Sequence, residues 1–128
     1  MGHRQSVNIP GFQHKNPIPN ASRVGNLLMT GVILGRNSVT DEVPGTLEGQ
    51  CRLVFEHMRA IVEAAGGATG DIIKVTVWLK DPLNRDALNA EWTTMFPDPD
   101  SRPARHTLLD TQESAYLVSC DFTAVITG

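Results

Sequence analysis

The chain has 128 residues, of which 41% are hydrophobic and 20% charged, a composition typical of one globular domain spanning residues 1–128. Fourteen acidic residues against eleven basic ones give a formal net charge of −3, and no Lys/Arg block occurs. We therefore expect no nucleic-acid partner, because affinity for phosphate backbones comes from clustered cations. No apolar run could span a membrane and no signal-peptide pattern begins the chain, so we also expect no membrane contact.

The two cysteines and four histidines bear on compartment and metal content. Cys51 and Cys120 are far apart, and each occupies an apolar position of its predicted element. This pattern favours buried free thiols in a reducing cytoplasm. The histidines show no metal-ligand spacing with each other or with the cysteines, so no metal site is expected.

The first third of the chain is predicted to contain one hairpin. Residues 1–20 carry three prolines and are expected to be irregular. Ser22–Val24 and Leu27–Ile33 are predicted strands, joined by a turn at Gly25-Asn26. A loop rich in Gly, Asn, Asp and Pro follows over residues 34–45.

A helix is predicted from Thr46 to the Gly66-Gly67 pair, because apolar residues recur there at three- and four-residue spacings. The stripe comprises Leu47, Cys51, Val54, Phe55, Met58, Ile61, Val62 and Ala65.

The remaining elements are a strand, a second helix and two closing strands. Ile72–Leu79 is rich in β-branched residues and predicts a strand. A helix is predicted from Arg85 to Met95, with Asn84 as its cap. Further strands are expected at residues 104–110 and 116–127.

The order β-β-α-β-α-β-β predicts an α+β fold with two helices on one face of a single sheet. In the last strand, residues of one parity are apolar and should lie beneath the helices: Val118, Cys120, Phe122, Ala124 and Ile126. In the strand before it, Ile72, Thr76 and Trp78 are predicted to oppose Ile73, Val75 and Val77. The second face is thus neither cleanly polar nor cleanly apolar. A solvated face would be compatible with this pattern, but Trp78 favours contact with another subunit.

Several segments resemble one known family, the reactive-intermediate deaminases (Rid, formerly YjgF). AGGATGDIIKVTVWLKD (65–81) is similar to its helix end, Gly-Asp turn and strand, and VGNLLMTG (24–31) to its hairpin. Asn89-Ala-Glu-Trp92 running into Phe96 fits its N-x-x-Y/W-x-x-F-F helix. Arg102-Pro103-Ala104-Arg105 fits its P-A-R element, and VSCDFTAV (118–125) its final V-E-I-E-A-x-A-V strand. Together these matches cover nearly the whole chain in the family's order.

The resemblance implies a chorismate-mutase-like fold with a mixed sheet and a homotrimer whose sheets form a central barrel. It also implies three clefts between subunits that bind small carboxylates without metal or organic cofactor. The family's key arginine falls on Arg105, which would hold the substrate carboxylate through two parallel N–H bonds.

The family's water-activating glutamate falls on Asp121, with one extra residue in the preceding loop, or on Thr123 after a two-residue slip. The flanking match favours Asp121, which is one methylene shorter than glutamate. Other lining positions would be Thr30 and Gly31 in the hairpin, Thr107 in place of a cysteine, and Ile18 in place of a tyrosine.

The implied activity is hydrolysis of small 2-amino-enoic or 2-imino acids to 2-keto acids and ammonia, with Arg105 and Asp121 as catalytic residues. Three alternatives stay open: a deaminase of a larger, aminomuconate-type intermediate, to which Ile18 and Asp121 point; a trimer that binds carboxylates without turnover; and an activity on RNA or as a holdase, which the acidic balance disfavours.

Overall fold

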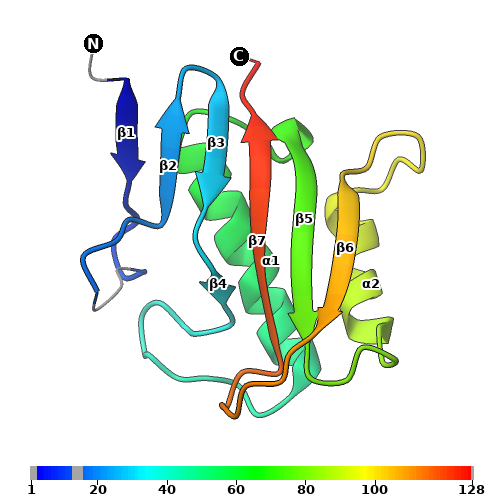
Figure 1. Cartoon of the computed structure of the whole chain (residues 1–128). Coiled ribbons are helices and arrows are strands. Elements are labelled where there is room, and N and C mark those ends of the chain that lie inside the picture. The colour runs from blue at the N-terminus through cyan, green and yellow to red at the C-terminus, as the bar shows by residue number, and fades with distance from the viewer. Residues whose placement is uncertain (1–2, 13–15, 128) are drawn as a thin grey trace.

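The computed structural model describes residues 3–12 and 16–127 as one mixed sheet with two helices packed on one of its faces (Figure 1). The strands of the N-terminal part are β1 (Arg4–Val7), β2 (Ala21–Val24), β3 (Leu27–Thr30) and β4 (Ile33–Leu34). They are followed by α1 (Leu47–Ala64), a short 3-10 turn (Thr69–Asp71), β5 (Ile72–Leu79), α2 (Asp86–Met95), β6 (Ala104–Leu109) and β7 (Val118–Val125). The predicted α+β class is confirmed.

The strands lie in the order β1-β2-β3-β7-β5-β6, and β4 pairs with β7 beyond the end of β3. Only β5 and β6 run parallel, which makes the sheet mixed, and α2 forms the connection between them. β6 is therefore an edge strand, and β7 lies in the middle of the sheet between β3 and β5 (Figure 1).

The ends of α1 follow from local sequence. Thr46 is the N-cap, and its hydroxyl accepts a hydrogen bond from the Gly49 N–H at 3.1 Å. At the other end Gly66 adopts φ +90°, which a side chain would disfavour. The Gly66 and Gly67 N–H groups then donate to Glu63 and Val62 carbonyls, which closes the helix in a Schellman motif.

The core lies between the helices and the sheet. The five β7-parity residues from Val118 to Ile126 that the sequence assigns to this face are all buried. Cys51 on α1 and Cys120 on β7 are both buried free thiols, as predicted.

The hairpin region differs from the prediction at two points. Residues 4–7 form strand β1, where irregular chain was predicted, and pair with β2. This edge strand is mostly polar and exposed, and backbone hydrogen bonds can form without an apolar sequence pattern. The predicted strand Leu27–Ile33 is divided, because β3 pairs with β7 only as far as Met29 and β4 resumes the pairing at Ile33.

Two details of the second half are also corrected. The cap of α2 is Arg85, without a side-chain cap bond, so the prediction of Asn84 is wrong. Ile72 is buried beside the helices and not on the face of Thr76, because the register with β7 shifts between Ile72 and Lys74. A bulge of this kind reverses the side-chain alternation on one side of it.

Among the described residues, no helix covers the second face of the sheet (Figure 1). This face exposes apolar side chains. Val24, Leu27 and Val125 lie opposite one another across β2, β3 and β7, and Met29 lies beside them. Met29 is 55% exposed and Val24 50%. The mixed character predicted for this face is therefore present in the structure.

Candidate functional site

Arg105 lies on the edge strand β6, directly opposite Val75 of β5. Val75 is fully buried beneath the helices, so Arg105 points to the helix-covered face of the sheet. Its guanidinium carbon lies 4.9 Å from the centroid of the Trp92 ring, which α2 supplies. The guanidinium is thus held against an aromatic face by a cation–π contact.

The charge of Arg105 has no acidic partner in the described part of the chain. The ion pairs found there involve other residues, and the Arg105 Nη1 atom is buried without a hydrogen-bond partner. Burial lowers the pKa of Arg105, and the positive charge of Arg85 lowers it further. A guanidinium nevertheless stays protonated in proteins, so this position would gain from an anion.

Thr107 lies two residues further along β6, opposite Val77, and shares the face of Arg105. It is half-buried. Its hydroxyl can therefore approach a molecule bound at the guanidinium from the same side of the strand.

Asp121 lies on β7 opposite Thr76, on the face without helices. Burial raises the pKa of its carboxyl group, and the charge of Lys74 opposes that effect. Thr123, the alternative for the same role, pairs with Lys74 and Met29 on the same face. In a single chain, Arg105 and Asp121 therefore lie on opposite faces of the sheet.

Ile18, Thr30 and Gly31 form a third group at the end of β3. The Thr30 hydroxyl accepts a hydrogen bond from the Phe122 N–H at 3.0 Å, where β3 separates from β7. The Gly31 N–H donates to the Asn20 carbonyl at 2.9 Å, and Ile18 is exposed. This group therefore borders β7, the strand that carries Asp121.

The structure thus divides the predicted site residues into three groups, of which the first and third are widely separated sets. Arg105 and Thr107 are on β6, whereas Thr30, Gly31 and Ile18 lie at β3, three strand positions away. At roughly 4.8 Å between neighbouring strands, that separation is about 14 Å. A small substrate cannot touch both sets in one copy of the chain.

The contact between Trp92 and Arg105 was not predicted from the sequence. Trp92 is buried, and its ring also meets Phe96 edge-on at 4.9 Å between centroids. The aromatic residue on the inner side of α2, next to the P-A-R element, was the available signal.

A second omission is His57, which lines a cavity of about 500 Å³ whose described lining does not include Arg105. The signal here was its position in the α1 stripe between Val54 and Ile61, a position that predicts burial.

Among residues 3–12 and 16–127, no group of three or more His, Cys, Asp or Glu side chains is arranged to hold a metal ion. Over the same residues, neither helix combines the length and apolar character needed to cross a bilayer.

The family model described as Endoribonuclease L-PSP matches residues 13–111. A RutC family protein of Haemophilus influenzae is 38% identical over 82 residues, which cover 64% of this chain and 63% of that protein. The 2-iminobutanoate/2-iminopropanoate deaminase of Escherichia coli K12 is 37% identical over 83 residues, 64% of this chain and 65% of that protein. The matched segments thus span slightly less than two thirds of these two curated relatives.

Among solved structures, the YjgF gene product of E. coli superposes with a TM-score of 0.85 at 27% identity, covering 94% of this chain and 98% of that one. Its agreement with the layers and strands described above extends the likeness beyond the matched sequence segment. The chain belongs to the Endoribonuclease L-PSP family, that of the YjgF- and RutC-type (Rid) proteins.

Proposed function

We propose that this protein is an imine deaminase that hydrolyses small 2-amino-enoic or 2-imino acids to 2-keto acids and ammonia. The observation that carries the proposal is the Arg105 guanidinium, which stacks on Trp92 and has one nitrogen buried without a partner among the described residues. A planar carboxylate satisfies such a group through two parallel N–H bonds. The relative named 2-iminobutanoate/2-iminopropanoate deaminase supports this substrate class.

The same proposal includes a homotrimer whose sites lie between subunits. Arg105 and Asp121 are on opposite faces of the sheet in one chain, so they can meet at one substrate only if different copies supply them. The helix-free face, with Met29, Leu27 and Val24 exposed, offers the apolar surface that subunits would bury. The two buried free thiols support a reducing cytoplasm as the compartment.

In the proposed mechanism, Arg105 binds the carboxylate and fixes the imine carbon near a water molecule. The Asp121 carboxylate accepts a proton from that water as its oxygen bonds to the imine carbon. Asp121 returns this proton to the imine nitrogen, which completes the carbinolamine. It then accepts the proton of the carbinolamine hydroxyl and passes it to the amino nitrogen, so that a C=O bond forms as the C–N bond breaks and a 2-keto acid and ammonia leave. Burial raises the pKa of Asp121, which makes it a stronger base than an exposed aspartate. Thr107 and Thr30 supply hydroxyls for orientation.

This route uses no metal or organic cofactor, because imines already hydrolyse in water and the protein only has to position and polarise the reactants. Asp121 reaches about one methylene less far than a glutamate would. The substrate must therefore lie closer to β7 than it would beside a longer acid.

The test is to generate 2-aminoacrylate or 2-iminobutanoate in situ and follow keto-acid release. Arg105→Ala should lower kcat/KM by about 10- to 100-fold, the effect of losing a charged hydrogen-bond pair. Arg105→Lys is the matched control, because it keeps the positive charge but cannot form two parallel N–H bonds. Its kcat/KM should lie between those of the wild type and Arg105→Ala. Equal rates for wild type and Arg105→Ala would remove the proposed role.

A second candidate substrate is a larger amino-enoate with a second acidic group, of the aminomuconate type. It is favoured by the positive charge of Arg85, which lowers the pKa of Arg105 in addition to the larger effect of burial. Ile18, where the family has tyrosine, also leaves a more apolar rim for a longer carbon chain.

For this candidate, Arg85→Gln should reduce turnover of a dicarboxylic imine by several-fold and leave that of 2-iminobutanoate unchanged. Rates would be compared in a competition assay with both substrates present. An equal effect on the two would exclude a role for Arg85 in selecting a second acid group.

A further inference from the structure

A cavity of about 500 Å³ lies between α1, β4 with the loop that follows it, and the segment before β2. Its walls include Phe12, Ile33, Val43, His57 and Tyr116. None of the residues placed in the proposed deaminase site lines it. Its volume is within the range of small-molecule sites in proteins, which are also concave and mostly apolar.

His57 and Asn20 are the two buried polar residues among the described residues that line this cavity. His57 projects from α1 with only 7% of its surface exposed, and its Nε2 atom lies 2.6 Å from the Arg36 carbonyl oxygen. A carbonyl can only accept, so Nε2 must carry the hydrogen. Burial lowers the pKa of His57, so the ring is neutral at pH 7 and Nδ1 is a hydrogen-bond acceptor. No described residue donates to Nδ1.

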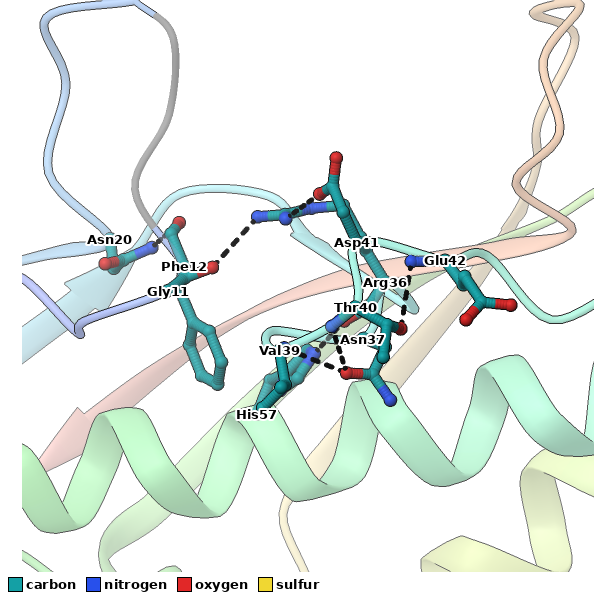
Figure 2. Close-up of polar contacts among 10 residues, drawn as sticks. All are labelled: Gly11, Phe12, Asn20, Arg36, Asn37, Val39, Thr40, Asp41, Glu42 and His57. Atoms are coloured by element: carbon teal, nitrogen blue, oxygen red, sulfur yellow. Dashed lines mark hydrogen bonds and ion pairs between the residues drawn. The ribbon is translucent and has the colours of Figure 1, made fainter.

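The charged groups of the cavity neutralise each other. Figure 2 shows the Arg36 guanidinium paired with the Asp41 carboxylate and donating to the Gly11 carbonyl at 3.3 Å. The described residues that line the cavity therefore offer no unpaired charge that would select an acid or an amine. A neutral ligand suits it, because a charged one would lose its hydration without gaining a partner.

The loop that carries this ion pair is held by its own hydrogen bonds (Figure 2). The Asn37 side chain accepts from the Val39 and Thr40 N–H groups at 2.8 and 3.0 Å. Asp41 adopts φ +67°, a left-handed conformation that aspartate tolerates better than most residues. The wall is thus formed before a ligand arrives, which lowers the entropic cost of binding.

Much of the remaining lining is aromatic or aliphatic, and the polar Asn20 side chain is already hydrogen-bonded to the Ile9 N–H and the Phe12 carbonyl. The Phe12 ring lies 4.1 Å from the His57 ring, centroid to centroid, tilted by 56°, and points down toward α1 in Figure 2. Ile33 and Val43 add aliphatic surface. A flat aromatic ligand could contact these side chains while its own N–H or O–H reaches the imidazole.

We propose that this cavity is a second ligand site, which binds a neutral aromatic molecule carrying one N–H or O–H group that donates to Nδ1 of His57. The ligand class is that of indoles and phenols, distinct from the carboxylates proposed for Arg105. This site and the deaminase site share no residue, so each proposal can fail without the other.

The experiment compares indole with 1-methylindole, which has the same ring but no N–H donor. Each is titrated into the ¹⁵N-labelled full chain, and the amide shifts are followed. We expect saturable shifts at Ile33, His57 and Ile61 with indole. The affinity for 1-methylindole should be about 10-fold lower, because it has no N–H group to donate to Nδ1. Phenol and anisole provide the corresponding O–H pair.

Two variants tie the effect to the cavity. His57→Phe keeps the ring shape without the acceptor and should bind indole and 1-methylindole equally. Val43→Trp should fill the cavity and abolish binding, whereas Val39→Trp, on the same loop but 90% exposed and outside the cavity, should not. Arg105→Ala should bind indole like the wild type.

Four results would overturn the proposal: no saturable binding of either donor ligand, equal wild-type affinity for both members of each pair, shifts centred on β6, or indole binding that survives Val43→Trp. If circular dichroism shows that His57→Phe is unfolded, the comparison of Val43→Trp with Val39→Trp still tests whether indole binds in this cavity.

Discussion

At the scale of single residues, Arg105 is defined by what surrounds its charge. It is half-buried, rests on an indole ring and has no acidic partner among the described residues, whereas Arg36 pairs with Asp41 and Arg102 donates to the Phe96 carbonyl. An anion bound at Arg105 would supply the missing partner. The position of the guanidinium depends on Trp92, which leads to a prediction about that residue.

Replacing Trp92 by Leu should weaken binding of 2-oxobutanoate, the keto acid that 2-iminobutanoate would yield, because the guanidinium loses its aromatic support. Cation–π contacts are worth about 0.5–2 kcal/mol, so the Kd measured by calorimetry should rise about 2- to 30-fold. Trp92→Phe keeps an aromatic face and should recover much of the affinity.

The control for this prediction is Phe96→Leu, which alters the buried neighbour of Trp92 without removing the ring beneath Arg105. Both leucine variants should lower the melting temperature. A Trp92→Leu protein that is destabilised but binds 2-oxobutanoate with unchanged Kd would show that Trp92 serves the core alone.

At the scale of elements, α1 supports both the core and the aromatic cavity, since one of its faces carries Val54, Met58 and Ile61 and also His57. Its start is determined by a single side-chain contact, that of Thr46 with the Gly49 N–H. Thr46 touches neither proposed site, so loss of this contact should affect them only through the stability of the helix.

Thr46→Ala should lower the free energy of unfolding by about 1 kcal/mol, because the Gly49 N–H loses its acceptor at the helix start. Thr46→Ser retains the hydroxyl and should be close to wild type. Urea unfolding followed by circular dichroism measures both. A loss of deaminase rate in Thr46→Ala under conditions where the protein is fully folded would contradict a purely structural role.

Elements also show where sequence patterns were sufficient. Strand β5 covers the same residues as the predicted strand, Ile72–Leu79. Helix α1 ends at Ala64, just before the Gly66-Gly67 pair that was predicted to end it. Strand β1 could not be predicted, because an exposed edge strand of Arg, Gln and Ser buries almost nothing and so carries no alternation. The bulge after Ile72 likewise leaves no mark in the sequence, yet it decides which isoleucine enters the core.

At the scale of the whole molecule, the sheet has one face under helices and one without them, and the two proposed catalytic groups are divided between these faces. Under the proposed mechanism, deaminase activity therefore requires assembly of the subunits. A chain that stays monomeric would hold a carboxylate at Arg105 with no general base beside it.

Met29→Asp, on the helix-free face, should convert the proposed trimer to monomers, because a charge would be buried in the subunit contact. The same variant should also lose keto-acid release. Sedimentation equilibrium and the deaminase assay measure the two effects. Val39→Asp, which is also highly exposed but lies on a loop, should change neither. A wild-type monomer with full activity would refute the shared site.

The sequence by itself determined the class of fold, the main helix, the buried parity of β7 and the placement of Arg105 and Thr107 on one strand, because periodicity and punctuation act over a few neighbouring residues. Family motifs added the chemistry expected of Arg105. Only the tertiary structure decided that Arg105 lies against the Trp92 ring and that Asp121 lies on the other face. It also decided that Phe12, Arg36 and His57, which are distant in sequence, enclose one cavity. These facts depend on strand order and register, which are set by contacts between distant segments and not by any local pattern.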